Sequence, residues 1–207
     1  MTDEIHTSRL VMRRWQGRDR APFAAINADP EVMRYFPSTL TRPESDALVD
    51  RIEEHFVEHG YGLWALEAQG RFVGLTGLLW ATWESDFTPA LEVGWRLGRS
   101  AWGRGYASEA ATAAVARGFE DVDSIVSFTA TSNQPSRRVM ERIGLRHVDD
   151  FEHPRLPDRH PLRRHVLYRA DRLTWRPRPA GPRSAQGGAR VVGGAGLTGH
   201  LDDGRVG

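Results

Sequence analysis

The chain has 207 residues and contains neither cysteine nor lysine, so all 28 of its basic residues are arginines. The absence of cysteine excludes disulfides, thiolate metal sites and cysteine nucleophiles. The absence of lysine excludes an internal Schiff base, a lysine general base and a self-acetylated lysine. No apolar run approaches the roughly 20 residues that a membrane helix needs, and positions 1–9 lack the apolar core of a signal peptide. We therefore expect a cytoplasmic protein without membrane contact.

The chain also lacks an excess of charge of either sign, since its formal net charge is only +1. No global field attracts nucleic acid, so we expect no nucleic-acid partner. The chain is long enough for one domain with a sizeable core. Beyond Asp171 it becomes rich in glycine, and large apolar residues almost disappear after Trp175. We predict a domain over 1–170 and a disordered tail over 171–207.

The most informative pattern is a strand followed by a glycine turn and a helix. Residues 91–97 alternate as a strand does, and an alanine-rich helix is expected over 107–119. The turn between them contains Gly103 and Gly105. Further strands are expected at 10–15, 63–67, 72–80, 124–129, 145–151 and 162–169, with helices at 19–27, 43–59 and from Asn133 onward.

Such a turn suits phosphate, because glycines allow close approach and the first amides of a helix are unpaired at its positive end. Arg104 can add charge, and Glu109 suits the helix dipole. The alternative is a simple connection between a strand and a helix. A dinucleotide-binding fingerprint is not met, because position 108 is serine rather than glycine and no acid follows at the required place. A Walker loop would require lysine.

Several segments in order resemble the GNAT acyltransferase superfamily, and its RimJ/RimL-type N-acetyltransferases in particular. They are Thr7–Arg13, Asp29–Met33, Trp102–Ala110, Asn133-x-x-Ser136, Glu141–Leu145 and His165–Tyr168. The resemblance covers roughly residues 5–170. It implies an α/β fold with a mixed, mostly antiparallel sheet, helices on both faces and two central strands that splay apart.

The resemblance also implies that acetyl-CoA lies between the splayed strands. Its pantetheine arm would pair with the backbone of Trp95, Arg96 and Leu97. Its pyrophosphate would bind the turn made by Trp102, Gly103, Arg104, Gly105, Tyr106 and Ala107. Asn133 and Ser136 would lie near the pantetheine and the thiol, although Asn133 also fits a helix cap. Trp102 occupies a position that is usually Gln or Arg in the superfamily, so one side-chain contribution to the pyrophosphate is lost.

The implied reaction is direct attack of a neutral amine on the thioester. Glu92 resembles the family's frequent general base, a role that requires partial burial to raise its pKa. The alternative is a structural acid paired with Arg96 on the same strand face. Ser136 is a candidate acid toward the departing thiolate, or else a first-turn serine that binds backbone.

The acceptor is expected to be a primary amine, of a small molecule or of a protein N-terminus. Residues 27–45, 82–90 and 151–162 are the variable regions that would select it. The histidines and acids at 153, 158, 160 and 165 lack tight ligand spacing, so no metal is expected. A non-catalytic acyl-CoA sensor is the alternative function, and a homodimer remains open.

Overall fold

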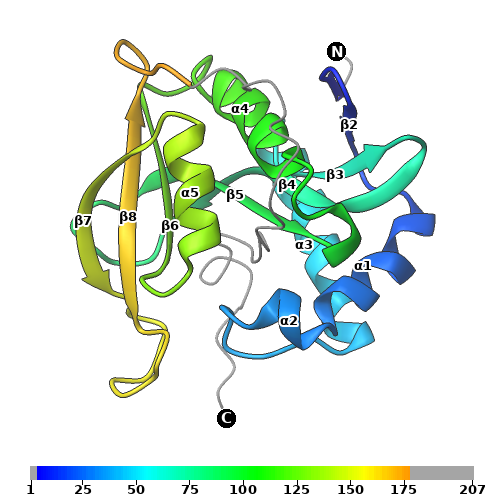
Figure 1. Ribbon diagram of the computed structural model, residues 1–207, viewed down its shortest axis with the longest axis horizontal. Helices are drawn as coiled ribbons and strands as arrows, with labels where there is room; N and C mark the ends of the chain where they lie inside the picture. The colour runs from blue at the N-terminus through cyan, green and yellow to red at the C-terminus, as the bar shows by residue number, and fades with distance from the viewer. Residues whose placement is uncertain (1–3, 178–207) are drawn as a thin grey trace.

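A computed structural model describes residues 4–177 and shows an eight-stranded sheet with strand order β1-β2-β3-β4-β5-β6-β8-β7 (Figure 1). The strands are β1 (Ile5–His6), β2 (Leu10–Arg13), β3 (Leu63–Ala68), β4 (Arg71–Ala81), β5 (Ala90–Leu97), β6 (Ser124–Ala130), β7 (Arg146–Glu152) and β8 (Arg164–Asp171). All neighbours run antiparallel except β5 and β6, which are parallel. The predicted mixed, mostly antiparallel α/β fold is confirmed.

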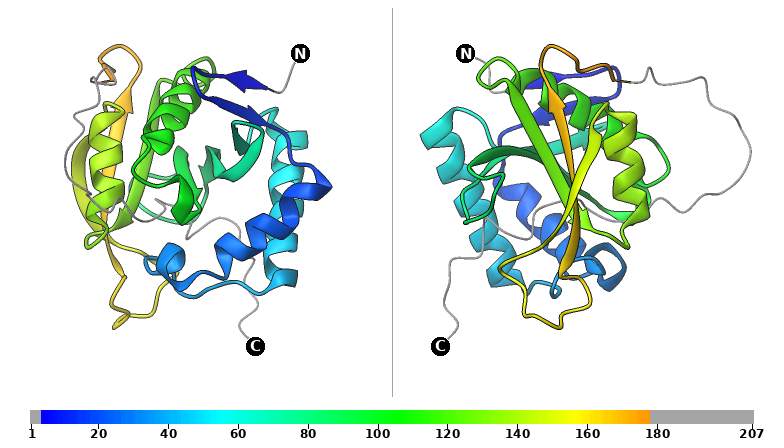
Figure 2. Two further views of the ribbon diagram at one scale, coloured as in Figure 1. Left: turned by 45° about the vertical axis from the view of Figure 1, so that its right-hand side comes forward. Right: turned by 90° about the vertical axis from the view of Figure 1, so that its left-hand side faces the viewer.

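Helices cover both faces of the sheet (Figure 2). One face carries α1 (Arg20–Asn27), α2 (Pro30–Met33) and α3 (Arg42–His59), and the other carries α4 (Tyr106–Gly118) and α5 (Gln134–Arg142). Two short 3-10 helices, at Gly17–Asp19 and Arg99–Ala101, complete the regular structure of the described residues. Because strand side chains alternate between faces, each strand residue can be assigned to one helical layer.

Local sequence signals account for the ends of α3 and for the hairpin that follows. The Thr41 hydroxyl and the Glu44 carboxylate form a capping box at the start of α3. Gly60 ends the helix in the left-handed conformation, with φ 74°. Gln69 and Gly70 turn the chain between β3 and β4 with φ of 51° and 71°. The helix expected at 43–59 and the strands expected at 63–67 and 72–80 are thus confirmed.

Two short elements were not predicted from the sequence. One is α2, which Asp29 caps by accepting from the Glu31 amide at 2.9 Å. The two residues of β1 were not predicted, since a strand so short carries no readable alternation. β1 pairs with β2 through Ile5–Met12 and His6–Val11 and lies at the edge of the sheet.

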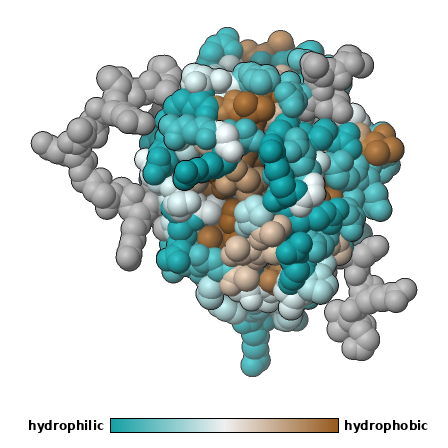
Figure 3. All heavy atoms as spheres, turned by 90° about the vertical axis from the view of Figure 1, so that its right-hand side faces the viewer, coloured by the Kyte–Doolittle hydropathy of each residue, from teal (hydrophilic) through white to brown (hydrophobic). Residues whose placement is uncertain are grey.

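The main hydrophobic core extends through both helical layers, and a smaller aromatic cluster lies at the end of the sheet formed by β6, β7 and β8. That smaller cluster contains Trp83 and Phe128, with Phe87 and Phe151 packed against it. The side of the molecule drawn in Figure 3 is mostly hydrophilic, with smaller apolar areas between the polar side chains. Among the described residues, no helix combines the length and apolar character needed to cross a bilayer.

The ordered part of the domain extends past the expected boundary at residue 170. The Trp175 ring packs against Phe119 with 5.4 Å between centroids, and its indole nitrogen donates to the Ile143 carbonyl at 2.7 Å. This large apolar residue therefore anchors the segment that follows β8. The rest of the predicted disordered tail, residues 178–207, lies outside the described residues.

Candidate active site

The two parallel strands at the centre of the sheet separate after a short contact. β5 pairs with β6 only at Leu91–Ile125 and Glu92–Val126. On its other edge, β5 pairs with β4 along its whole length, as far as Leu97–Gly74. Beyond Glu92, β5 therefore has a strand partner on one edge only, and the expected splayed strand pair is confirmed.

The glycine turn follows the separated half of β5 and leads into α4. Gly103 and Gly105 have φ of 72° and 78°, and Gly105 is the residue that caps α4. None of the amides of residues 103–107 donates a hydrogen bond to the residues that the structure describes. Several unpaired N–H groups thus meet at the positive end of the α4 dipole, an arrangement that binds anions.

Side chains around the turn hold its backbone in place. The Trp102 indole nitrogen donates to the Leu97 carbonyl at 2.8 Å, and Arg104 Nε donates to the Ser100 carbonyl at 3.1 Å. Arg9 Nη1 donates to the Arg104 carbonyl at 2.7 Å. Trp102 therefore joins the end of β5 to the turn, a role that its position in the sequence did not reveal.

The first turn of α4 is also tied to the N-terminal segment. The Glu109 carboxylate accepts from the Thr7 hydroxyl at 2.6 Å, the Ser8 hydroxyl at 3.0 Å and the Arg9 amide at 2.9 Å. Arg9 also forms an ion pair with Glu109. Burial alone would raise the pKa of Glu109, but these hydrogen bonds hold it below its ordinary value. The sequence showed that Glu109 suits the dipole but not that it joins these segments.

A pocket lies between β5, the turn and α5, with an empty volume of about 530 Å³ that includes space open to solvent. Its lining residues are Trp95, Leu97, Ala101, Trp102, Gly103, Gly105, Tyr106, Ala107, Ser108, Val139 and Arg142. The Trp95 indole nitrogen is buried and has no hydrogen-bond partner among the described residues. Most of the residues expected to bind the cofactor on β5 and the turn thus border one space.

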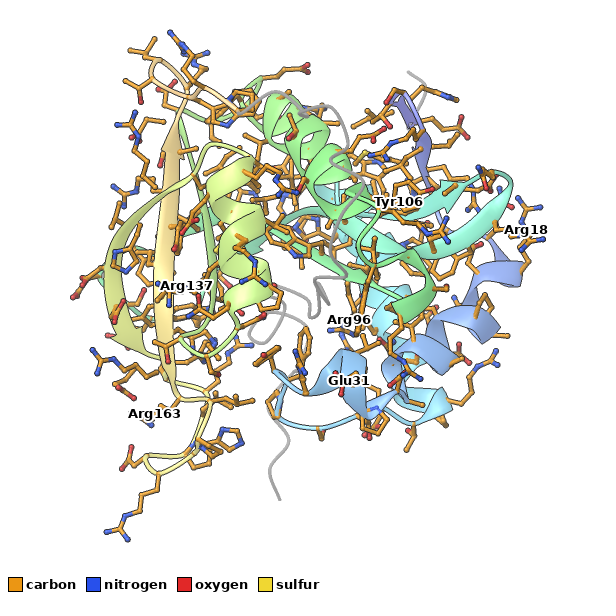
Figure 4. The ribbon with its side chains drawn as sticks, in the orientation of Figure 1. Arg18, Glu31, Arg96, Tyr106, Arg137 and Arg163 are labelled. Carbon is orange, nitrogen blue, oxygen red and sulfur yellow. The ribbon has the colours of Figure 1, made fainter. Side chains whose placement is uncertain are left out.

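Glu92 and Arg96 lie on the opposite face of β5, toward α1 and α2. Each is 3% exposed. Arg96 Nη1 donates to Asn27 Oδ1 at 2.6 Å, and its guanidinium lies 4.3 Å from the centre of the Phe36 ring. Figure 4 shows Arg96 near the centre of the molecule, between Tyr106 at the start of α4 and α2.

The sequence-based alternative that Glu92 pairs with Arg96 is wrong. No ion pair joins them, and Arg96 is held instead by an amide oxygen and an aromatic ring. Residues four apart on a strand have Cα atoms about 13 Å apart, which explains why sharing a face does not bring the side chains together. Burial raises the pKa of Glu92 well above its ordinary value, and Glu92 Oε1 has no hydrogen-bond partner among the described residues.

Asn133 and Ser136 begin α5 and are both completely buried. Asn133 caps the helix by accepting from the Ser136 amide at 3.3 Å, and its Nδ2 donates to the Thr129 hydroxyl at 2.9 Å. The capping alternative for Asn133 is therefore observed. On α5 the pocket is lined by Val139 and Arg142, one and two turns further along the helix.

The histidines considered as metal ligands do not gather around a common point with acidic side chains. His153 and His165 lie 4.9 Å apart between ring centroids, whereas Asp158 forms an ion pair with Arg163 at 2.8 Å. No group of three or more potential metal-ligating side chains gathers among residues 4–177. Burial lowers the pKa of His153 to about 3 and that of His165 to about 4, so both rings are neutral in the aromatic cluster with Trp83.

Comparison with known proteins assigns the chain to a family. The family model described as "Acetyltransferase (GNAT) domain" matches residues 9–146, which include the splayed strands, the glycine turn and α5. This protein therefore belongs to the GNAT acetyltransferase family. The match confirms the superfamily that the sequence motifs resembled and identifies the protein as an acetyltransferase.

Two relatives are similar to this chain over more than two thirds of its length. An uncharacterised Bacillus subtilis protein, YkkB, is 30% identical over 147 residues, covering 69% of this chain and 84% of its own. The FsC-acetyl coenzyme A-N(2)-transacetylase of Aspergillus fumigatus is 30% identical over 158 residues, covering 71% of this chain and 66% of its own.

Solved structures match in fold. A GNAT-family acetyltransferase from Bacillus anthracis has a TM-score of 0.68 at 24% identity, covering 81% of this chain and 98% of its own. A RimL ribosomal L7/L12 α-N-protein acetyltransferase in complex with coenzyme A has a TM-score of 0.67 at 15% identity, covering 81% of this chain and 97% of its own. At these identities the likeness is one of fold.

Proposed function

We propose that the protein transfers the acetyl group of acetyl-CoA directly to a primary amine. The observation that carries this proposal is the row of unpaired amides at residues 103–107, which borders the pocket beside the half of β5 that lacks a second strand partner. An anion at this helix start and an extended chain along the free strand edge are the two features that a coenzyme A diphosphate and its pantetheine arm present together.

The turn residues Gly103 to Ala107 would hold the pyrophosphate through backbone N–H groups, with Trp102 and Arg104 fixing the loop. The pantetheine would then lie along Trp95, Arg96 and Leu97. Because the Leu97 carbonyl already accepts from Trp102, its backbone contribution to the pantetheine would come from its N–H. The indole N–H of Trp95 is a further donor available in the pocket.

Glu92 would take the proton that the amine loses as it attacks the thioester carbon. The carbon–nitrogen bond forms, the carbon–sulfur bond breaks, and the sulfur leaves as a thiolate. A carboxyl whose pKa is raised by burial holds a proton near neutral pH more readily than an exposed one, which suits a general base. Ser136, buried at the start of α5, is the proposed proton donor to the thiolate.

The acceptor would approach from the face of the sheet that carries Glu92 and α2, opposite the cofactor pocket. Met33 and Phe36 on that side and Trp83 in the aromatic cluster are buried and would form parts of its wall. The similar Aspergillus fumigatus enzyme is named as an N(2)-transacetylase, which supports transfer to a nitrogen. We also propose that the acceptor is a small-molecule amine or a protein N-terminus, that the protein belongs to the RimJ/RimL branch and that it is cytoplasmic.

The test is calorimetric titration of the purified protein with coenzyme A, followed by release of free thiol from acetyl-CoA on addition of an amine panel. The panel includes N-terminal peptides, lysine peptides, polyamines and aminoglycosides. Binding of coenzyme A together with amine-dependent thiol release is the expected result. Absence of binding would refute the cofactor assignment, and an acetylated protein intermediate would refute direct transfer.

A further inference from the structure

Two arginines are buried in the described part of the chain, and only one of them has carboxylate partners. Arg13 is 4% exposed; its Nη1 and Nη2 donate to the two carboxylate oxygens of Asp19 at 2.7 and 3.0 Å, and Nη2 also donates to Glu67 at 3.0 Å. Its positive charge is fully matched within the protein. Arg13 shows how this chain accommodates a buried guanidinium when the role is structural.

Arg96 is equally buried but has no carboxylate partner among residues 4–177. The one hydrogen bond that its guanidinium makes with the described residues goes from Nη1 to Asn27 Oδ1, and Nε is buried without a partner there. The Phe36 ring covers one face of the guanidinium. Burial of an unmatched charge costs free energy that neither a neutral amide nor a ring offsets completely.

The unpartnered edge of this guanidinium matches one kind of ligand. With Nη1 occupied, Nε and Nη2 present two parallel N–H groups, the fork that binds both oxygens of a carboxylate. Phe36 and the hydrogen bond that Nη1 donates to Asn27 fix the plane of the fork. Asn27 is itself fixed, since its Nδ2 donates to the Ser45 hydroxyl at 2.9 Å. The fork is thus preorganised by α1 and α3 before any ligand arrives.

We propose that Arg96 binds a carboxylate of the acceptor, so that the substrate is an amine that also carries a carboxylate group. The inference rests on the proposed function, because Arg96 shares the face and the strand of Glu92. An acceptor lying along β5 presents its amine toward Glu92 and its carboxylate toward Arg96. The two Cα atoms are about 13 Å apart along the strand, so the acceptor series below includes amines and carboxylates at more than one separation.

The experiment compares matched pairs of acceptors in the wild type and in Arg96→Gln. L-Phenylalanine, L-methionine and γ-aminobutyrate are each paired with their primary carboxamide, and kcat/KM is measured for both members. The carboxylate-to-amide ratio, compared between the two proteins, cancels the difference in amine pKa within each pair. A charge-assisted bidentate contact is worth about 10- to 100-fold. Arg96→Gln is expected to lower that ratio by this factor.

Two further variants separate recognition from structure. Arg96→Lys retains the charge without the fork and is expected to give an intermediate ratio. Arg99→Gln removes an exposed arginine close by on the chain, which pairs with Asp29, and is expected to leave the ratio unchanged. An equal loss of activity toward carboxylates and carboxamides in Arg96→Gln would show a structural role and overturn the proposal.

A measurement on the wild type keeps the proposal testable if Arg96→Gln does not fold. The N-acetylated carboxylates are expected to inhibit competitively against the acceptor at least 10-fold better than the N-acetylated carboxamides. Equal inhibition by the two would overturn the role of Arg96. Coenzyme A affinity is measured in parallel: its absence in the wild type refutes the proposed function, whereas normal affinity with an unchanged ratio refutes only the recognition of a carboxylate.

Discussion

The two faces of β5 are built from different chemistry. On one face, Trp95 and Leu97 border a pocket whose polar contacts come from unpaired backbone amides of the following turn. On the other face, Glu92 and Arg96 are buried side chains whose ionisable groups have no oppositely charged partner in the described part of the chain. Backbone donors suit a ligand that is always the same, whereas buried charged side chains suit proton transfer and the selection of one acceptor.

The largest effect is expected on the face of the buried charges. Glu92→Gln retains shape and burial but removes the base, so kcat is expected to fall about 10²- to 10³-fold. The coenzyme A dissociation constant should stay within twofold, because Glu92 does not border the pocket. Steady-state kinetics and calorimetry measure the two quantities. An unchanged kcat would remove Glu92 from the mechanism.

A smaller effect is expected from the turn. Gly105→Ala forces an alanine to φ 78° and places a methyl group 3.3 Å from Arg9 Nη2, so the row of amides should be displaced. Coenzyme A affinity is expected to fall about tenfold, by calorimetry. Gly60→Ala is the matched control, since it has a similar φ of 74° and open space around it, and it does not line the pocket. Equal affinities in the two variants would contradict the anion site.

Trp102→Phe tests whether the indole hydrogen bond positions the turn. Loss of the donor to the Leu97 carbonyl should cost about 1 kcal/mol of stability and raise the coenzyme A dissociation constant a few-fold. Trp175→Phe removes an equivalent bond, to the Ile143 carbonyl, away from the pocket. The melting temperature should fall by a similar amount in both variants, while only Trp102→Phe should weaken coenzyme A binding. A loss of affinity in both would indicate a general effect of stability.

The smallest expected effect is on the pH dependence of stability, which should differ between substitutions of two glutamates. Burial raises the folded-state pKa of Glu92, so the folded state keeps this proton to higher pH than the unfolded state does. The free energy of unfolding therefore falls progressively as the pH rises above the unfolded pKa of about 4.3. Glu92→Gln should therefore gain melting temperature relative to the wild type as pH increases from 4.5 to 8. The pKa of Glu109 is lowered, so its contribution is fully present above that pH and is lost only on further acidification, as the pH falls through the folded-state pKa. Glu109→Gln should therefore melt below the wild type by a constant margin from pH 4.5 to 8 and approach the wild type only at lower pH. Equal pH dependence of the two variants over pH 4.5 to 8 would contradict the assignment of Glu92, and a margin that persists on acidification would contradict that of Glu109.

The sequence predicts the periodic and glycine-marked features well. The helix at 43–59, the strands at 63–67 and 72–80 and the glycine turn at 103–105 were predictable, because each depends on residues close together in the chain. The alanine-rich helix after the turn was readable for the same reason. The family motifs then supplied the splayed strands, which no local pattern indicates.

Long-range partners were not predictable in this way. The contact of Arg96 with Asn27 joins residues 69 positions apart, and that of Glu109 with Thr7 joins residues 102 apart. A shared strand face suggested instead that Glu92 and Arg96 pair. Which partner an arginine reaches depends on how helices pack over the sheet, information that is distributed over the whole chain.

The link between Glu109 and residues 7–9 has a practical consequence for handling the protein. These N-terminal residues supply four hydrogen-bond donors to the first turn of α4, so a deletion or a bulky fusion ahead of Leu10 would loosen the start of that helix. Coenzyme A affinities measured on such a variant would reflect the altered N-terminus as well as the native site. A tag is better placed at the opposite end of the chain.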